Sequence, residues 1–443
     1  MDVQTSQQEN TCLLFGLGRI GLPLSLVLAE AGFNVLAIEK NEKTVEVLTG
    51  GEEPFYEPGM KELLDKHLNK NFFVYNHQYF LENLKKFQEA GYIIMAVGMN
   101  LDLASKKPDL TVLRQATEDL LKAGLKGKTI ILRTTVPLVT TDSIKQELEK
   151  QSGLEESKDF HLIFAPERLA EGKAIEEETN LPKIIGAYSD SGFEKASELF
   201  SKVGGEIIKI GQPKMAEFVK LIDNSWRNLT FAYANDLSVM AREHGLDAFG
   251  AIKAANSGYA RNNIPLPGPV SGYCLWKDPL IFEHSFAEIT KERGFPSLSF
   301  AGRQVNDWLF KYIVQKVPKG NVLVLGLSFK KDVDDYRFSH SVAIIKELLN
   351  KGCSVRVMDP YLNRNNYTKL PEDLNAIACS TLEQGLDNID AIILATNHQE
   401  YGQPFAQEIA QKLSQSPKEV MVFDLWRAWP DLAANKNINY QTL

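Results

Sequence analysis

One cysteine, Cys274, stands among residues that could activate a thiol. It lies in Gly272-Tyr-Cys-Leu-Trp-Lys-Asp278, just before an apolar stretch with a helical pattern. A cysteine beside a lysine at the start of a helix gains stabilisation of its thiolate from the helix dipole and the cation. The segment favours a nucleophile, although a lone cysteine is more often a small buried hydrophobic residue. The other three, Cys12, Cys353 and Cys379, stand in strand-like or apolar contexts, and we expect them in the core.

Two further pairs of polar residues could take part in chemistry. Glu167 and Glu171 follow the apolar strand expected at 161–164, and loops at the carboxyl ends of parallel strands are where ligands bind. Lys220 and Asn224 are four residues apart on an expected helix and share one face, where an ammonium and an amide could bind an oxyanion. The alternatives are a solvated acidic loop and an ordinary surface pair.

A glycine motif indicates a dinucleotide site. Gly16-Leu-Gly18-Arg-Ile-Gly21 follows an expected strand at 11–15 and opens an expected helix at 22–31. Glu39 lies 21 residues after Gly18, at the end of the next expected strand. The glycines allow a tight turn and close approach of a pyrophosphate to the helix N-terminus, and the acid binds the ribose hydroxyls. Because Glu39 repels a 2′-phosphate, the sequence predicts NAD rather than NADP.

A related turn occurs in the C-terminal part of the chain. Gly326-Leu-Ser328 follows an expected strand at 321–325 but lacks the third glycine, so we do not expect a second dinucleotide there. The basic residues that follow, Lys330, Lys331 and Arg337, suit a phosphorylated substrate. The alternative is a solvated basic loop.

The elements that must position these residues alternate between strands and helices in both halves of the chain. Apolar strand patterns recur at 34–38, 92–97, 128–132, 353–358, 391–394 and 420–423. From 214 to Gly245 there is a long helical pattern with no proline or glycine before its last residue. Such alternation is typical of doubly wound parallel sheets. We predict an α/β protein with two Rossmann-like domains, 1–210 and 317–443, joined by a long central helix and a helical middle domain, 211–316.

Composition narrows the classes of function. The 49 basic and 57 acidic residues give a net charge of −8 and are interleaved, which argues against a nucleic-acid-binding surface. The most apolar stretch is broken by Arg19, Pro23 and Glu30, and residues 1–10 lack the pattern of a secretory signal, so we expect no membrane segment. Four dispersed cysteines without a CxxC pair predict no metal site and a reducing, cytoplasmic environment.

Taken together, the motifs resemble those of the UDP-glucose/GDP-mannose dehydrogenase family over almost the whole chain. The matching pieces, in the order of the family, are Gly16-x-Gly18-x-x-Gly21, Pro54-Phe-Tyr-Glu-Pro-Gly59, Thr134-Thr-Val-Pro137, Pro166-Glu-Arg-Leu-Ala-Glu-Gly172, Lys220-x-x-x-Asn224, Gly272-x-Cys274-x-x-Lys277-Asp278 and Gly326-Leu-Ser-Phe-Lys-Lys-Asp332 with Arg337. The resemblance implies oxidation of the C6 hydroxyl of a nucleotide sugar to a uronic acid with two molecules of NAD, in support of polysaccharide or glycan synthesis. It also implies a homodimer formed through the central helix.

The resemblance further assigns roles to residues. Cys274 would form a thiohemiacetal and then a thioester, Lys220 and Asn224 would stabilise oxyanions, Asp278 and Thr135 would order water, and Glu167 would assist proton transfer. The residues implied for NAD are Gly16, Gly18, Arg19, Ile20, Gly21, Glu39, Thr135, Glu171 and Lys277. Those implied for the nucleotide sugar are Leu169, Ala170, Glu171, Lys220, Asn224, Gly272, Phe329, Lys330, Arg427 and, reaching a neighbouring subunit, Arg261.

Departures from the family pattern keep alternatives open. Gly98-Met-Asn100 replaces the usual Thr-Pro, and Ser271-Gly272 replaces the usual Gly-Gly. Pro267-Gly-Pro269 and Lys277-Asp-Pro279 look more like the branch that acts on UDP-N-acetylhexosamines than the branch that acts on UDP-glucose. The rival functions are a hydroxy-acid dehydrogenase that stops after one oxidation, for which a thiol is unnecessary, and a catalytically silent dinucleotide-binding protein.

Overall fold

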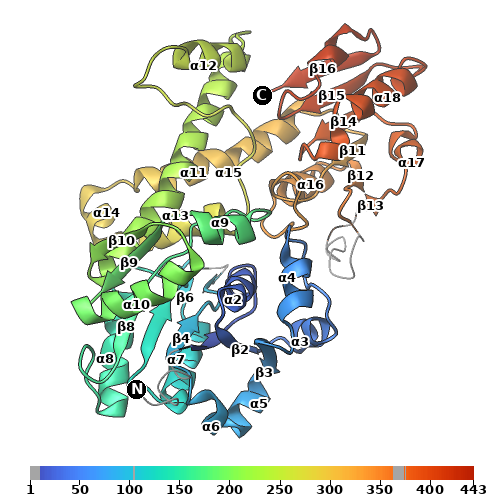
Figure 1. Cartoon of the computed structure of the whole chain (residues 1–443). Coiled ribbons are helices and arrows are strands. Elements are labelled where there is room, and N and C mark those ends of the chain that lie inside the picture. The colour runs from blue at the N-terminus through green and yellow to red at the C-terminus, as the bar shows by residue number, and fades with distance from the viewer. Residues whose placement is uncertain (1–9, 103–104, 363–373, 375) are drawn as a thin grey trace. The chain divides into compact units, whose positions relative to one another are not determined.

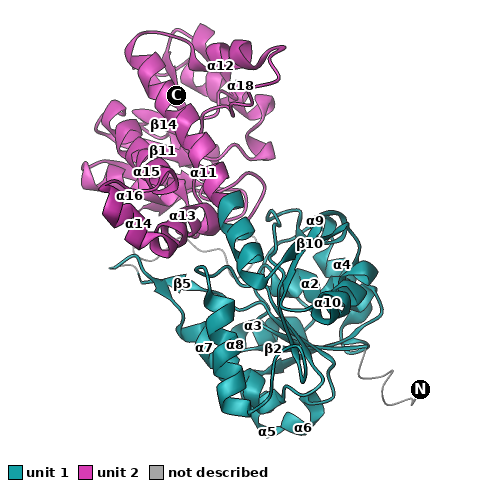
Figure 2. Ribbon diagram, turned by 90° about the vertical axis from the view of Figure 1, so that its left-hand side faces the viewer, with its two compact units in different colours: residues 1–223 teal, residues 224–443 magenta. Residues whose placement is uncertain are grey.

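The computed structural model describes residues 10–102, 105–362, 374 and 376–443. The chain divides into two compact units, residues 1–223 and residues 224–443 (Figure 2). The N-terminal segment judged to lack a secretory signal lies outside the described residues, except for Asn10. The finer division into three domains, with boundaries near 210 and 316, stays a prediction.

The first unit is built on an eight-stranded sheet with the order β10-β9-β8-β7-β4-β1-β2-β3. Its strands are β1 (Thr11–Phe15), β2 (Asn34–Glu39), β3 (Phe72–Asn76), β4 (Tyr92–Met95), β7 (Thr129–Leu132), β8 (His161–Phe164), β9 (Lys183–Ala187) and β10 (Ile207–Gly211). The sheet is parallel except between β8 and β9. The strands predicted in this unit, β1, β2, β4, β7 and β8, all pair in parallel, which confirms the predicted sheet. The unpredicted strand β9 is antiparallel to β8, because the connection from β8 turns back along its neighbour instead of crossing over.

Helices cover both faces of this sheet, because alternate strand residues point to opposite sides. Cys12 and Leu14 pack in one apolar cluster with α2 (Gly21–Glu30), α4 (Met60–His67) and α10 (Asp190–Val203). Leu13 and Phe15 pack in the other cluster with α5 (His77–Glu82), α6 (Leu84–Phe87), α7 (Thr111–Ala123) and α8 (Thr140–Ser152). The short elements α3 (Glu42–Thr49), α9 (Ala174–Asn180) and the pair β5 (Asn100–Leu101) and β6 (Pro108–Asp109) complete this unit.

The second unit combines helices with a six-stranded parallel sheet of order β13-β12-β11-β14-β15-β16 (Figure 1). The strands are β11 (Asn321–Leu325), β12 (Ser354–Met358), β13 (Ile377–Ala378), β14 (Ala391–Leu394), β15 (Val420–Asp424) and β16 (Ile438–Thr442). The helices are α12 (Ala248–Asn256), α13 (Tyr273–Ser285), α14 (Ala287–Arg293), α15 (Leu298–Lys316), α16 (His340–Asn350), α17 (Leu382–Leu386) and α18 (Gln403–Leu413). The long helix α11 (Pro213–Glu243) begins in the first unit and continues into the second.

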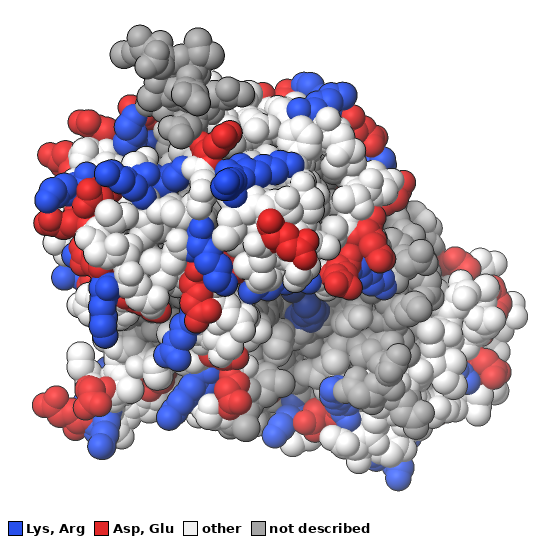
Figure 3. All heavy atoms as spheres, turned by 90° about the horizontal axis from the view of Figure 1, so that it is seen from below, with Lys and Arg blue, Asp and Glu red and all other residues white. Residues whose placement is uncertain are grey.

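The surface charge and the hydropathy of the helices are relevant to binding of nucleic acids and membranes. On the face shown in Figure 3, basic and acidic side chains of the described residues are interspersed, as the interleaved sequence predicts. In the part of the chain that the structure describes, no helix is both long enough and apolar enough to cross a membrane.

Candidate active site

The glycine turn of the first unit has the geometry that a dinucleotide requires. Gly16 has a φ of +93°, and a side chain on Gly21 would meet the Gly16 carbonyl oxygen at 1.8 Å. A side chain on Gly18 would meet nothing within 4 Å, so the backbone there is open. Ile20 precedes α2 without a capping side chain, which leaves the helix N-terminus available to a phosphate.

Glu39 lies beside this turn. One carboxylate oxygen accepts a hydrogen bond from the amide of Leu17 at 2.7 Å, and the other accepts one from the amide of Asn41 at 2.8 Å. The acid thus holds the glycine turn against the end of β2. These residues fit NAD, which they would hold through its pyrophosphate and its ribose hydroxyls.

The loop that carries Glu171 is joined to the same turn. Arg19 pairs with Glu171 at 3.4 Å, and its guanidinium lies 4.7 Å from the centre of the Phe55 ring. Glu57 is buried and accepts hydrogen bonds from the amides of Gly172 and Ala174 at 2.9 and 2.7 Å. The motif at 54–59 gives no sign in the sequence that Glu57 anchors this loop, so this role was not predicted.

Glu167 and Lys220 form a buried ion pair. The ammonium of Lys220 lies 2.7 Å from Glu167 Oε1 and 2.8 Å from the Glu167 carbonyl oxygen. The other carboxylate oxygen accepts the amide of Leu169 at 2.9 Å, and the amide of Ala170 is bound by Glu177. Burial raises the pKa of Glu167, but the charge and hydrogen bond of Lys220 outweigh it, and the pKa falls below its usual value. Glu167 is therefore an ionised carboxylate at neutral pH.

A second buried ionic cluster supports this loop and was not predicted. Arg133 follows β7 and pairs with Glu178 of α9 at 2.9 Å, and Lys183 of β9 lies 3.5 Å from the same carboxylate. Arg133 also helps to lower the pKa of Glu167. Thr135, two residues further on, is buried in the same segment. The only signal in the sequence is a charged residue directly after an apolar strand.

In the second unit, a polar cluster surrounds the start of α13. The side-chain amide of Asn224 donates to Asp278 at 2.6 Å, and Lys277 pairs with the other oxygen of Asp278 at 2.6 Å. Asp278 has no exposed surface. Burial lowers the pKa of Lys277, but the negative charges of Asp278 and of the ionised Cys274 raise it to about 12, so the ammonium keeps its proton. Cys274 occupies the second position of α13, where its side chain is exposed.

Aromatic side chains fix the segment before α13. Gly272 has a φ of +89°, and a side chain there would meet the Phe329 ring at 2.4 Å. Its amide donates to the Phe338 carbonyl at 3.0 Å, and the Phe338 ring stacks on Trp276 with centroids 4.3 Å apart. The structure thus brings Gly272 and Phe329, both predicted to bind the substrate, into contact.

The turn after β11 repeats the geometry of the glycine turn. Gly326 has a φ of +89°, and Asp359 at the end of β12 accepts the amide of Leu327 at 2.6 Å, as Glu39 accepts that of Leu17. Lys330 is half-buried after this turn. Arg337 pairs with Asp335 at 2.6 Å, so its charge is partly balanced within the chain.

The remaining predicted residues lie elsewhere in the second unit. Arg427 follows β15 and pairs with Asp247, before α12, at 2.5 Å. Arg261 is exposed, with its guanidinium 4.6 Å from the centre of the Tyr259 ring. Its predicted reach into a neighbouring subunit stays a prediction.

The cysteines other than Cys274 divide into two groups. Cys12 and Cys353 are buried, as expected. The expectation that Cys379 lies in the core was wrong, because its segment is a short edge strand whose two residues, Ile377 and Ala378, are exposed. Among the described residues, no group of three or more potential ligand side chains could hold a metal ion.

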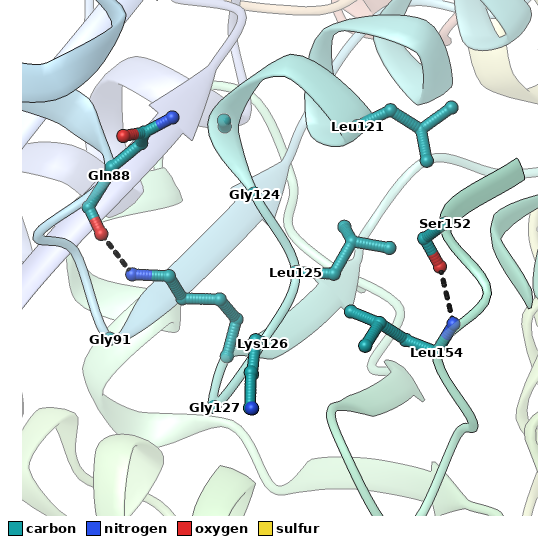
Figure 4. A pocket seen from close by; sticks show the side chains of 11 residues that line it. Gln88, Gly91, Leu121, Gly124, Leu125, Lys126, Gly127, Ser152 and Leu154 are labelled. Atoms are coloured by element: carbon teal, nitrogen blue, oxygen red, sulfur yellow. Dashed lines mark hydrogen bonds between the residues drawn. The ribbon is translucent and has the colours of Figure 1, made fainter.

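A cavity of about 620 Å³ in the first unit lies apart from the glycine turn. Leu121, Leu125 and Leu154 line it together with Gln88 (Figure 4). Gly91 and Lys128, which precede β4 and β7, also line it, so the cavity opens where these strands begin. The glycine turn follows the end of the parallel strand β1, at the opposite edge, where ligands of such sheets bind.

Models of a single protein family match three consecutive segments of the chain. The NAD binding domain of the UDP-glucose/GDP-mannose dehydrogenase family matches residues 10–204, the central domain matches residues 214–308, and the UDP binding domain matches residues 323–431. Together these segments cover most of the sequence, and they identify NAD as the cofactor.

Individual relatives agree with this assignment. A UDP-N-acetyl-D-mannosamine dehydrogenase of Methanococcus maripaludis is 30% identical over 441 residues, covering 95% of each chain. A UDP-N-acetyl-D-glucosamine 6-dehydrogenase of Salmonella typhi is 27% identical over 414 residues, covering 89% of this chain and 92% of that protein. The solved UDP-D-ManNAc dehydrogenase of Pyrococcus horikoshii has the same fold, with a TM-score of 0.82, 24% identity and 98% coverage of both chains. The chain therefore belongs to the UDP-glucose/GDP-mannose dehydrogenase family and is an NAD-dependent nucleotide-sugar dehydrogenase.

Proposed function

We propose that the protein oxidises the C6 hydroxyl of a UDP-N-acetylhexosamine to a carboxylate in two steps, through covalent intermediates on Cys274. The observation that carries this proposal is the buried cluster of Asn224, Lys277 and Asp278 around the first turn of α13, where Cys274 is exposed. The relatives that act on UDP-N-acetylhexosamines, and the segments 267–269 and 277–279, support the choice of sugar.

The proposed reaction consists of two oxidations followed by a hydrolysis. Loss of a proton and a hydride from the alcohol gives an aldehyde, and the thiol of Cys274 adds to its carbon to give a thiohemiacetal. Loss of a second proton and hydride gives a thioester, and attack of water releases the carboxylic acid and restores the thiol. NAD, bound at the glycine turn, supplies the hydride acceptor for each oxidation.

The chain's own residues provide charge and proton transfer. The ammonium of Lys220 and the amide of Asn224 stabilise the negative oxygen that develops at C6. Glu167 is ionised and so accepts a proton from water during hydrolysis of the thioester. Asp278 and Thr135 order that water, and Lys277 keeps a positive charge beside the thiol, which favours the thiolate.

Substrate binding and assembly complete the proposal. Phe329, Lys330 and Arg427 bind the nucleotide, and the loop 169–171 binds the sugar. The enzyme acts in the cytoplasm as a homodimer formed through α11.

A panel of nucleotide sugars tests this function. Purified protein is incubated with NAD and UDP-N-acetyl-D-mannosamine, UDP-N-acetyl-D-glucosamine, UDP-glucose or GDP-mannose, and NADH and carboxylate are measured. We expect about two NADH per sugar, since each nicotinamide accepts one hydride. One NADH without carboxylate would support a single-step dehydrogenase, and no turnover would support a silent binding protein. Turnover of UDP-glucose alone would contradict the choice of sugar.

A further inference from the structure

A buried hydrogen bond joins the segment before Cys274 to His340. The hydroxyl of Ser271 lies 2.7 Å from Nδ1 of His340, and Nε2 of the same ring lies 2.6 Å from the Ala395 carbonyl oxygen. Because a carbonyl only accepts hydrogen bonds, Nε2 carries the proton and Nδ1 accepts the hydroxyl of Ser271. His340 has no exposed surface, and Ser271 is 8% exposed.

These contacts tie three elements together. His340 is the first residue of α16, and Ala395 directly follows β14. The indole of Trp426, after β15, also donates to the Ala395 carbonyl at 2.8 Å. The Trp426 ring lies so close to Gly268 that a side chain there would meet it at 2.7 Å. The segment 268–271 is therefore held against the end of the second unit's sheet.

Gly272, between this anchor and Cys274, has a backbone conformation that depends on its neighbours. With a φ of +89° and no side chain, glycine has more backbone freedom than any other residue. Contacts of the neighbouring residues therefore help to hold such a segment in one conformation. Ser271 stands where glycine is usual in the family motif, and glycine has no hydroxyl to make this bond.

We propose that Ser271 and His340 are positioning residues that hold the start of α13, and with it the Cys274 thiol, in the conformation that attacks the aldehyde. The role of Cys274 rests on the proposed function, whereas the positioning itself rests on the contacts above. In the direction assigned above, Nδ1 accepts the Ser271 hydroxyl, which requires the neutral imidazole. Burial outweighs the hydrogen bond to Ala395, which raises the pKa of His340, and with a smaller effect of the nearby His398 the pKa falls to about 4, so the ring is neutral at pH 7.

Serine variants test the proposal. We compare the wild type with Ser271→Ala, which removes the hydroxyl, Ser271→Thr, which keeps it, and Ser285→Ala, which removes a hydroxyl hydrogen bond at the other end of α13. Hydrogen–deuterium exchange is measured for the peptide 271–278, and kcat and KM are measured with NAD and the sugar from the panel. In Ser271→Ala, exchange rises and kcat falls about fivefold to tenfold, the factor expected from one buried hydrogen bond. Both values of KM change less than about twofold, since binding groups are untouched.

The controls decide the interpretation. We expect Ser271→Thr to restore exchange and kcat, and Ser285→Ala to match the wild type. Unchanged exchange and kcat in Ser271→Ala, or a Ser271→Thr variant as impaired as Ser271→Ala, would overturn the positioning role. If the wild type oxidises none of the sugars, the proposed function fails, but the exchange measurement still decides whether Ser271 orders the start of α13.

Discussion

At the scale of single residues, the most specific prediction concerns the thiol of Cys274. Its thiol lies in the first turn of α13, beside an ammonium that keeps its proton. We predict that Cys274→Ser lowers carboxylate formation by at least about 1,000-fold, because serine is far less ionised and forms an ester with a poorer leaving group. Carboxylate is measured by chromatography alongside NADH. Cys379→Ser, outside the predicted site, serves as the control, and acid formation by Cys274→Ser at a near wild-type rate would contradict the covalent mechanism.

A second prediction for a single residue concerns Glu39 and the choice between NAD and NADP. Its carboxylate already accepts two backbone amides, so a 2′-phosphate would face a fixed negative charge. We predict that NAD is preferred over NADP by at least about 10-fold in kcat/KM, about 1.4 kcal/mol. Glu39→Gln removes the negative charge and should reduce the ratio of kcat/KM for NAD to kcat/KM for NADP. Equal efficiency of the wild type with both cofactors would show that the acid plays no such role.

At the scale of elements, two glycines in the turn between β1 and α2 are expected to serve different purposes: Gly21 the stability of the fold, and Gly18 the binding of NAD. Gly21→Ala places a methyl group against a backbone carbonyl, so α2 must shift. Overpacking costs about 1–3 kcal/mol, which predicts a Tm lower by about 3 °C or more in calorimetry. Gly18→Ala meets no protein atom and should leave Tm within about 1 °C, yet it stands where the pyrophosphate approaches, so KM for NAD should rise about 10-fold. An equal decrease in Tm in both variants would contradict the expectation that Gly21 serves stability and Gly18 serves NAD binding.

At the scale of the whole molecule, His340 makes the stability of the second unit depend on pH. Its pKa in the folded chain is about 4, below the usual 6.5, so between these values the unfolded chain binds more protons. The free energy of unfolding of the second unit is therefore expected to fall as pH drops from about 6.5 to about 4. The part of this fall that is due to His340 is about 3 kcal/mol. All five tryptophans lie in the second unit, so tryptophan fluorescence during urea unfolding follows that unit. His340→Gln should flatten the pH profile, whereas His284→Gln, an exposed control, should not.

Assembly is the second property of the whole molecule. Trp226, Tyr233 and Met240 are more than half exposed and recur every seven residues on α11, so they form one apolar stripe. A stripe of this kind fits the predicted homodimer. We expect Trp226→Glu to shift the protein towards a monomer in analytical ultracentrifugation. Lys253→Glu, an exposed change on α12, should leave the mass as in the wild type, and a wild-type monomer would refute the dimer.

The sequence by itself determined the local elements and the dinucleotide turn. The strands and helices in residues 11–39 and 321–358 can be predicted from the spacing of their apolar side chains, because this spacing is visible within a short segment of the sequence. The glycine motif with Glu39 is likewise local, since its members are joined by one strand, one helix and the next strand. Cys274 with its neighbouring lysine was also recognisable from a short segment, and the family resemblance added the roles of the individual residues.

Only the tertiary structure decided which polar groups meet. Glu57 and Gly172 are 115 residues apart, and Ser271 and His340 are 69 apart, so no periodic pattern relates them. The burial of Cys379 was mispredicted for the same reason, and the antiparallel direction of β9 has no signal in the sequence, because edge position and strand direction depend on how distant segments pair. The spacing of apolar residues indicates only whether a side chain faces the core. Which group pairs with a buried charge depends on how distant segments of the chain pack together.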